Sequence, residues 1–239
     1  MGYRAVSFDM GHTLVFPRYE VYQELLGIAG AGADREAMEA MEGRLRGWFD
    51  DVVRQEGLRE GIWTEYYKRF FAGLDVPEEK MREVLLELRD RHVEGVGLWI
   101  EPAPEAEEAL EGVRERGLKV ISISNNDGRL RRMVEYQGWE DRFDLLVDSE
   151  DVGVSKPDPG IFRAALEGLG IEAEELLHVG DYYSVDVEGA RNAGVRGVLY
   201  DPIRSYETVD CPRITRLGQV LELLDSPEAF GAPPADREH

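Results

Sequence analysis

The sequence predicts an α/β fold, a doubly wound parallel sheet with an α-helical domain inserted after the first strand. Short apolar runs that end in polar residues recur along the chain, and helix-length amphipathic segments separate them. A long stretch of helical periodicity lies between the first apolar run and the second. Alternating strands and helices favour a layered sheet, because each crossover helix covers one face of it. The inserted helices then form a domain of their own.

The apolar runs are the predicted strands. They are short and nearly continuous, as in strands that are buried on both faces of a parallel sheet. They cover residues 4–9, 119–125, 144–148, 175–181 and 196–201. The amphipathic segments predict helices over residues 105–116, 129–137, 161–169, 186–193 and 213–224. Repeated units of this kind predict a Rossmann-like core.

The inserted stretch has apolar residues at the spacing of helical turns. We interpret its methionine and aromatic stripes as the core of a helical bundle. One such stripe consists of Met38, Met41, Leu45, Trp48 and Val52.

Prolines bracket the insertion and indicate the domain boundaries. The α/β core domain is predicted at residues 1–16 and 100–225, the helical cap domain at 17–99, and a loose tail at 226–239. A module attached to the end of a first strand would lie at the carboxyl edge of the sheet, where open α/β sheets bind ligands.

The composition excludes several classes of partner. The chain has 28 basic and 49 acidic residues, a net charge of −21, which repels nucleic acid and anionic lipid surfaces. We therefore expect no nucleic acid and no membrane partner. The single cysteine, Cys211, excludes an intramolecular disulfide and a cysteine-rich metal site. The chain has no secretory-signal pattern and no apolar run near the roughly 20 residues of a membrane span, so we expect a cytoplasmic protein.

Polar residues follow the first two predicted strands. Asp9 leaves the first strand in the segment FDMGHTL, where Gly11 permits a tight loop. An ordinary strand-ending aspartate is an equally good interpretation of Asp9 alone. Ser124 and Asn125 follow the second strand and offer a hydroxyl and an amide, which are also routine turn groups.

Two further features lie later in the chain. Lys156 precedes a proline in VSKPDP, which favours an extended turn, although a solvated surface lysine is the simpler interpretation. Asp181 and Asp186 lie in HVGDYYSVD, and this acidic pair suits either a hard cation or a helix N-terminus. His178 lies within the preceding strand and is interpreted as a packed core histidine.

Together, these four features resemble the four motifs of haloacid-dehalogenase-like hydrolases in their order and strand-end placement. The inserted helices resemble the helical cap of that family. The resemblance implies that Asp9 is a covalent nucleophile, Ser124 binds the transferring group and Lys156 neutralises its charge. We expect Asn125 and His12 to bind substrate.

The same resemblance implies a magnesium ion. Asp9, the carbonyl of Gly11 and Asp181 are its expected ligands, and Asp186 either joins them or orients water or Lys156. Mg²⁺ prefers oxygen ligands and keeps several waters, so two carboxylates and a carbonyl suffice. A phosphoryl group in transfer carries charge on its oxygens, which a cation and a lysine stabilise.

The chain departs from the family pattern at Gly11. Related phosphatases generally carry an aspartate at this position, which acts as general acid and base, so proton transfer is in question. His12 sits beside the gap and has an ordinary pKa of about 6.5, suited to proton transfer near neutrality. A loop histidine that packs against the cap is the alternative.

Three functional hypotheses follow. The first is a Mg²⁺-dependent phosphatase of small phosphorylated metabolites that works through an aspartyl-phosphate. The second is a hydrolytic 2-haloacid dehalogenase, since these enzymes also lack the second acid, although they typically lack the acidic motif found at Asp181 and Asp186. The third is a catalytically degenerate protein that binds a phosphorylated ligand.

Overall fold

The computed structural model describes residues 2–93 and 96–226. The chain divides into two compact units. The α/β unit comprises Met1–Phe16, Pro102–Pro202 and Tyr206–His239, and the helical unit comprises Pro17–Glu101 with Ile203–Ser205. The predicted tail at 226–239 lies, apart from its first residue, outside the described residues.

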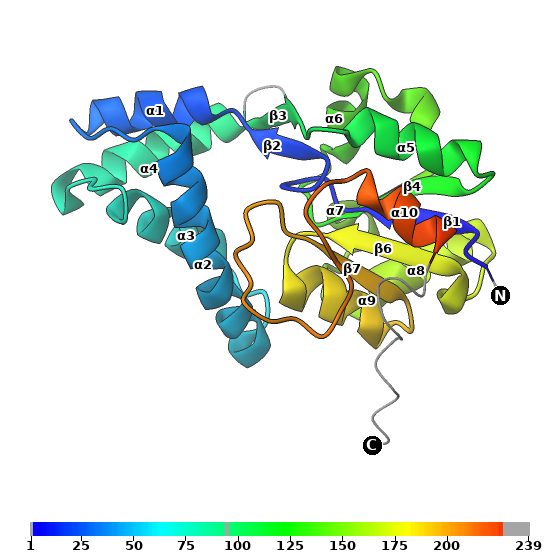
Figure 1. Cartoon of the computed structure of the whole chain (residues 1–239). Coiled ribbons are helices and arrows are strands. Elements are labelled where there is room, and N and C mark those ends of the chain that lie inside the picture. The colour runs from blue at the N-terminus through cyan, green and yellow to red at the C-terminus, as the bar shows by residue number, and fades with distance from the viewer. Residues whose placement is uncertain (1, 94–95, 227–239) are drawn as a thin grey trace. The chain divides into compact units, whose positions relative to one another are not determined.

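A six-stranded parallel sheet forms the centre of the α/β unit (Figure 1). Its order is β5-β4-β1-β6-β7-β8. The strands are β1 Ala5–Phe8, β4 Lys119–Ser124, β5 Leu145–Asp148, β6 Leu176–Gly180, β7 Arg196–Tyr200 and β8 Arg213–Ile214. From β1 the chain moves outward to β4 and β5, then returns to the other side of β1 for β6 to β8. This order confirms the doubly wound sheet, and its switch point lies at the carboxyl end of β1.

Helices cover both faces of this sheet. The longer ones are α5 Ala106–Glu115, α6 Leu130–Gln137, α8 Pro159–Leu169 and α10 Gln219–Asp225, and the shorter ones are α7 Ser149–Val152 and α9 Glu188–Asn192. In Figure 1, α5, α6 and α10 lie on one face of the sheet, and α8 and α9 on the other. Phe162 of α8 and Ala190 of α9 belong to one buried hydrophobic cluster with Ile121 and Ile123 of β4.

Two of the predicted helices differ from the observed ones. The segment 213–224 is not one helix, because Arg213–Ile214 pair with Leu199 and Tyr200 as the edge strand β8, and α10 starts only at Gln219. The Gln219 side chain accepts the amide of Thr215 at 2.8 Å and so closes the intervening turn. The segment 186–193 starts instead as a π-helix, Tyr183–Val187, which leads into α9.

Two short strands escaped the sequence analysis. β2 Val15–Pro17 and β3 Trp99–Pro102 form a two-stranded sheet. Each ends in a proline, which lacks the amide hydrogen needed in a sheet interior but is tolerated at a strand end. These strands occur where the chain passes between the two units.

The helical unit contains α1 Tyr19–Ile28, α2 Arg35–Glu56, α3 Ile62–Ala72 and α4 Glu78–Val93. In this unit α2 packs on α3, α3 on α4 and α4 on α1. The predicted stripe on α2 is buried at Met38, Met41 and Leu45 but continues through Phe49 and Val53. Trp48 and Val52 are only half-buried, because the helical period of 3.6 residues displaces the stripe by one position.

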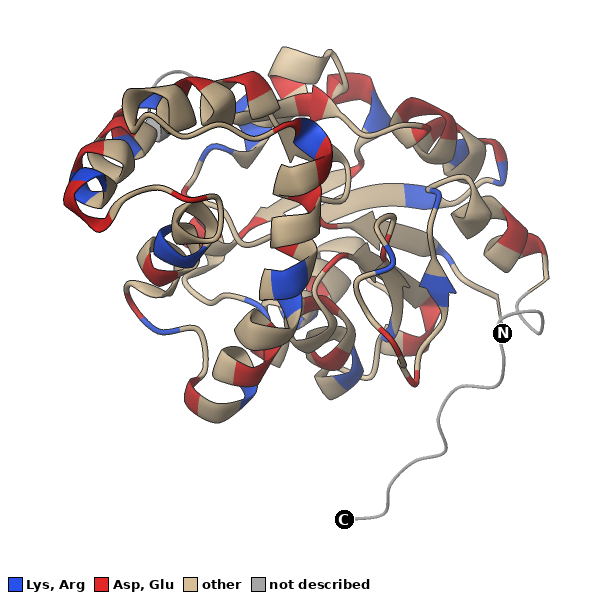
Figure 2. Cartoon of the chain, turned by 60° about the vertical axis from the view of Figure 1, so that its left-hand side comes forward, with Lys and Arg blue, Asp and Glu red and all other residues tan. Residues whose placement is uncertain are grey.

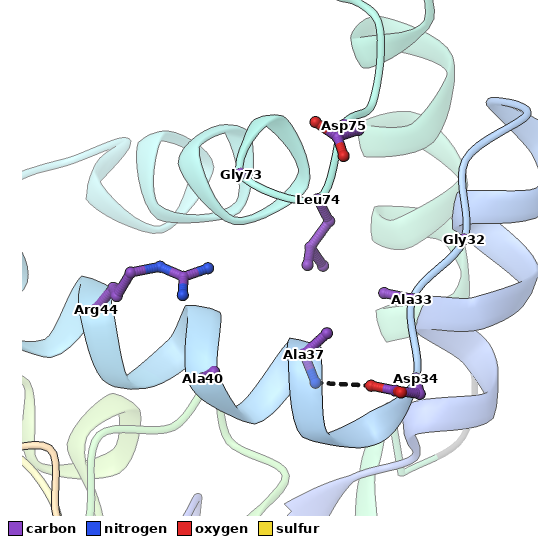
Figure 3. Close-up of a pocket in the computed structure, with 9 residues that line it drawn as sticks. All are labelled: Gly32, Ala33, Asp34, Ala37, Ala40, Arg44, Gly73, Leu74 and Asp75. Carbon is purple, nitrogen blue, oxygen red and sulfur yellow. Dashed lines mark hydrogen bonds between the residues drawn. The ribbon is translucent and has the colours of Figure 1, made fainter.

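A hollow of about 410 Å³ lies within the helical unit (Figure 3). Small residues of α2 and of the loops before α2 and after α3 leave this space. Asp34 caps α2 here by accepting the amide of Ala37 at 2.9 Å. The lining residues are Gly32, Ala33, Asp34, Ala37, Ala40, Arg44, Gly73, Leu74 and Asp75. None of the predicted site residues lines this hollow.

Acidic and basic residues alternate along many of the helices (Figure 2). Arg35 and Glu39, for example, are one turn apart on α2 with their charged atoms at 2.8 Å. Such exposed pairs contribute about 0–1 kcal/mol each, so we assign the surface charge no large role in stability. Among the described residues, no helix is long and apolar enough to cross a bilayer.

Glu42 is an exception to the exposure of charged residues. It lies on α2 with 4% of its surface exposed, and its carboxylate accepts a hydrogen bond of 2.8 Å from the Tyr19 hydroxyl. Burial raises the pKa of Glu42 to about 7, although Tyr19 and Arg46 oppose the shift. An acid with a raised folded-state pKa binds its proton more tightly in the folded protein, so its stabilising effect is lost as the pH rises through about 7.

We expect Glu42→Gln to abolish this pH dependence. The amide keeps an acceptor for Tyr19 but cannot ionise. Below the unfolded-state pKa of about 4.5 the two proteins should have similar free energies of unfolding, and above pH 7 the variant should be more stable by about 3 kcal/mol. Urea unfolding at pH 4.5, 6 and 8 measures this difference. The exposed Glu36→Gln serves as control, and a Glu42→Gln difference that does not grow with pH would contradict the assignment.

Candidate active site

Asp9 lies at the switch point of the sheet. It follows β1, whose last residue pairs with Ser122 of β4 on one side and Val179 of β6 on the other. The amide of Asp9 donates to the Val179 carbonyl at 2.9 Å, which continues the ladder by one residue. The side chain is 12% exposed. The carboxylate is thus held on a rigid backbone yet retains access to solvent.

The loop after Asp9 turns back on itself at once. Gly11 forms an isolated parallel bridge with Val15. Its two hydrogen bonds, of 2.9 and 2.7 Å, use the Met10 carbonyl and the His12 amide, so neither uses the carbonyl of Gly11. That carbonyl is therefore compatible with its predicted role as a cation ligand.

His12 adopts the left-handed backbone conformation, with φ of 53°. Glycine occupies this region without steric cost, whereas a histidine is strained there. The side chain is 7% exposed, and its ring meets the edge of Phe16 at 5.7 Å between centroids. The packing with Phe16 resembles that of a loop histidine, and proton transfer or substrate binding by His12 stays a prediction.

Lys156 lies in the loop between α7 and α8, and it is 1% exposed. Its Nζ donates to Oδ1 of Asp9 at 2.7 Å and to Oδ1 of Asp186 at 2.6 Å. The simple interpretation of a solvated surface lysine is therefore wrong. The structure joins three residues that the sequence singled out separately.

The three charges perturb one another. Burial disfavours a charged Lys156, but the Asp186 and Asp9 carboxylates outweigh it and raise the lysine pKa. Burial would raise the pKa of Asp186, but Lys156 and His178 hold it well below its usual range. Burial raises the pKa of Asp9, which Lys156 only partly offsets. A cation bound beside Asp9 would oppose this rise.

Asn125 fixes the backbone that carries Lys156. Its Nδ2 donates to the Lys156 carbonyl at 2.9 Å, and its Oδ1 accepts the Lys156 amide at 2.7 Å. The side-chain amide of Asn125 thus positions the lysine, and its expected contact with substrate stays a prediction. Ser124 ends β4 with 3% of its surface exposed, beside the strand that carries Asp9.

Asp186 is held by three donors. Besides Lys156, its Oδ1 contacts Nε2 of His178 at 3.2 Å, and its Oδ2 accepts the amide of Tyr182 at 2.9 Å. The carboxylate therefore orients Lys156, which is one of the two roles expected for it. A direct bond to a metal, the other expected role, stays a prediction.

Two buried residues of the hydrogen-bond network were not assigned to the site from the sequence: Ser7, which was not singled out, and His178, which was interpreted as a packed core histidine. Ser7 on β1 contacts His178 Nδ1 at 2.8 Å, and both residues are 0% exposed. A polar residue within an otherwise apolar strand was the available signal for each. It was not decisive, because isolated serines and histidines also occur in ordinary protein cores.

The donor set is compatible with magnesium. Asp9 and the 2%-exposed Asp181 follow neighbouring strands and offer hard carboxylate oxygens, with the Gly11 carbonyl as a third donor. The partly uncompensated burial of Asp9 is also relieved by a bound cation. Over residues 2–93 and 96–226, no group of three or more His, Cys, Asp or Glu residues is arranged to hold a metal. A site here would therefore depend on the carbonyl and on water.

The chain is similar in sequence to a known family of enzymes and to several of its members. The model of one family, haloacid dehalogenase-like hydrolase, matches residues 3–194. A Mycobacterium tuberculosis protein named as a phosphatase is 31% identical over 230 residues, which covers 93% of this chain and 98% of that protein. The haloacid dehalogenase-like hydrolase domain-containing protein 3 of Mus musculus is 38% identical over 130 residues, and the match spans 52% of each chain.

A solved structure shares the fold. The magnesium-bound HAD-hydrolase YfnB of Bacillus subtilis superposes with a TM-score of 0.67 at 17% identity, covering 94% of this chain and all of that one. At this identity the likeness concerns the fold alone.

Gly180 is expected to be essential for the placement of Asp186. A Cβ atom at this position would lie 2.6 Å from Oδ1 of Asp186 and closer still to its carboxyl carbon. Gly180→Ala should displace the carboxylate from Lys156 and lower hydrolytic turnover roughly 10- to 100-fold, the cost of a charged hydrogen bond. Steady-state kinetics would measure it.

The matched control is Gly27→Ala. Gly27 lies on α1 with no atom within 4 Å of the added methyl group, so turnover should be unchanged. Thermal unfolding must first establish that both variants are folded at the assay temperature. Wild-type turnover in Gly180→Ala would show that the position of Asp186 is irrelevant to the reaction.

Proposed function

The chain belongs to the haloacid dehalogenase-like hydrolase family, and we propose that it is a Mg²⁺-dependent phosphatase of small phosphorylated metabolites. The observation that carries the proposal is the buried Lys156 ammonium shared by Asp9 and Asp186. If Asp9 is the nucleophile, this fixed positive charge would lie next to the oxygens of the phosphoryl group under attack. The mycobacterial relative named as a phosphatase supports the same class of reaction.

The proposed reaction has two steps. A carboxylate oxygen of Asp9 attacks phosphorus, the bond to the ester oxygen breaks, and the leaving alkoxide takes a proton from water or from His12. Water then attacks the phosphorus of the aspartyl-phosphate and gives up a proton to solvent or to His12. The bond between phosphorus and the Asp9 oxygen breaks, which releases inorganic phosphate and restores the carboxylate. Lys156 neutralises the transferring oxygens in both steps, and Ser124 donates a hydrogen bond to them.

Magnesium would supply charge neutralisation and substrate orientation in this site. Asp9, Asp181 and the Gly11 carbonyl would hold it, and Asp186 is proposed to act through Lys156. We further propose a diffusible substrate and a cytoplasmic location, in keeping with the strongly acidic composition. Hydrolytic dehalogenation is the second candidate, favoured by the absence of a carboxyl group at position 11.

The proposal predicts phosphate release that depends on both magnesium and Asp9. A panel of phosphate monoesters and 2-haloacids, assayed with Mg²⁺ and with EDTA, should give turnover only for monoesters with Mg²⁺. Asp9→Asn should abolish it, because an amide does not form the acyl-phosphate. Fluoroberyllate, which imitates a phosphoryl group on a carboxylate, should bind wild type and not Asp9→Asn. Halide release without magnesium would favour the dehalogenase, and no turnover at all would favour a binding protein.

A second prediction concerns Gly11→Asp. General acid–base catalysis contributes roughly 10²–10⁴-fold and matters most for basic leaving groups such as alkoxides. The added carboxylate should therefore accelerate hydrolysis of alkyl phosphates more than that of p-nitrophenyl phosphate, whose leaving group needs little protonation. The ratio of the two kcat/KM values is the measurement.

His12→Ala is the companion variant. If His12 already supplies the proton, this variant slows alkyl substrates selectively and Gly11→Asp adds little. Equal acceleration of both substrate classes by Gly11→Asp would contradict the view that the absent carboxyl group at position 11 limits protonation of the leaving group. Magnesium affinity and thermal stability of each variant must match wild type before the rates are compared.

A further inference from the structure

A buried pair of polar side chains lies inside the sheet, near the end of β1, the strand that precedes Asp9. Ser7 on β1 and His178 on β6 are directly paired in the sheet register, and both are 0% exposed. The Ser7 hydroxyl and Nδ1 of His178 are 2.8 Å apart. Burying two polar side chains is costly unless their hydrogen bonds are satisfied. None of the steps proposed above uses either residue.

The hydrogen-bond partners assign the histidine tautomer. An ionised Asp186 only accepts hydrogen bonds, so Nε2 of His178, 3.2 Å from Asp186 Oδ1, must carry the hydrogen. Nδ1 then accepts the Ser7 hydroxyl hydrogen. The other acceptor near that hydroxyl, the Leu177 carbonyl, is more distant at 3.3 Å. Burial lowers the pKa of His178 and so favours this neutral form.

Asp186 lies on the π-helix Tyr183–Val187, a rare helix type that occurs mostly as single turns and frequently at functional sites. Lys156 has a long, flexible side chain, and its position over Asp9 depends on a fixed carboxylate partner. The Tyr182 amide holds Oδ2 of Asp186, and His178, on the rigid strand β6, supplies a second donor at Oδ1, the oxygen that contacts Lys156. The result is a continuous chain of contacts from Ser7 through His178, Asp186 and Lys156 to Asp9.

We propose that His178 is a positioning residue. Ser7 holds the His178 ring in one tautomer, and Nε2 of that ring holds the Asp186 carboxylate in the place where the carboxylate keeps Lys156 in contact with Asp9. The edge of the His178 ring also meets Phe162 of α8 at 5.0 Å between centroids, so the imidazole is fixed on a third side. The inference deepens the proposed function and rests on it wherever turnover is the readout.

Two variants of His178 test the proposal kinetically. In His178→Gln the side-chain amide can place a donor near the position of Nε2, whereas His178→Leu fills similar space without a donor. We expect kcat for p-nitrophenyl phosphate to fall roughly 10- to 100-fold in His178→Leu, the cost of a hydrogen bond to a charged group, and to recover to within about threefold of wild type in His178→Gln. The KM should change little in either variant.

Binding of vanadate separates positioning from general damage. Vanadate imitates the transferring phosphoryl group, so its affinity should fall in parallel with kcat in His178→Leu and recover in His178→Gln. Equal kcat losses in both variants, or unchanged vanadate affinity in His178→Leu, would overturn the positioning role.

Ser7→Ala has a matched control on the neighbouring strand. Ser122 is also 0% exposed, and its hydroxyl donates to the Phe8 carbonyl at 3.0 Å without touching His178. Both serine variants lose one buried hydroxyl and should lose similar stability. Only Ser7→Ala should lower kcat, by several-fold, because only that change removes the hydrogen bond that fixes the tautomer of His178. Equal effects on kcat in the two variants would contradict the role of Ser7 in fixing the His178 tautomer.

Nitrogen-15 NMR of the histidine-labelled wild-type protein tests the assignment without any turnover. The chain has 4 histidines, so comparison with His178→Gln identifies the resonance. We expect a hydrogen on Nε2 and a bare Nδ1, and the opposite tautomer would overturn the proposal. If the expected tautomer is present but the wild type hydrolyses no phosphate ester, the proposed function fails while the assigned hydrogen-bond chain stands.

Discussion

Lys156 carries a positive charge at a position that is 1% exposed. Removing one partner from a buried ion pair costs about 3–5 kcal/mol, because the remaining charge is left in a medium that solvates it poorly. Both carboxylates that contact the ammonium group therefore contribute to the stability of the α/β unit as well as to the chemistry of the site. Asp9 comes from the end of β1, and Asp186 from the turn after β6. One ammonium group thus joins segments that are distant in sequence.

The topology explains why this arrangement occurs at one edge of the sheet. The carboxyl ends of parallel strands share an edge, and the strand order reverses at β1, so the turns after β1, β4 and β6 converge there. The Asn125 side chain fastens the Lys156 backbone to the end of β4, and the π-helix after β6 turns Asp186 inward. Gly180 provides the space for that inward turn.

The strands of the α/β unit and the polar residues at their ends could be predicted, because apolar periodicity and strand-end placement are local properties of the sequence. β8 could not, since Arg213–Ile214 become a strand only by pairing with β7. The same limit applies to the side chains. Asn125 was predicted to bind substrate, and the structure adds a pairing with the backbone of Lys156, 31 residues away, which no spacing rule indicates. The catalytic residue types were readable, whereas the residues that orient them depend on contacts through space.

Under the proposed function, the loop after Asp9 would keep an electrostatic role and lack the usual group for proton transfer. Lys156 joins Asp9 and Asp186, and the left-handed backbone of His12 has a geometry better suited to glycine. Under the proposed function, glycine at position 11 lacks a proton donor, whereas the contacts of Lys156 with Asp9 and Asp186 remain. Such a site would favour leaving groups that depart without protonation, and it would have to obtain any other proton from the loop, from water or from the substrate itself.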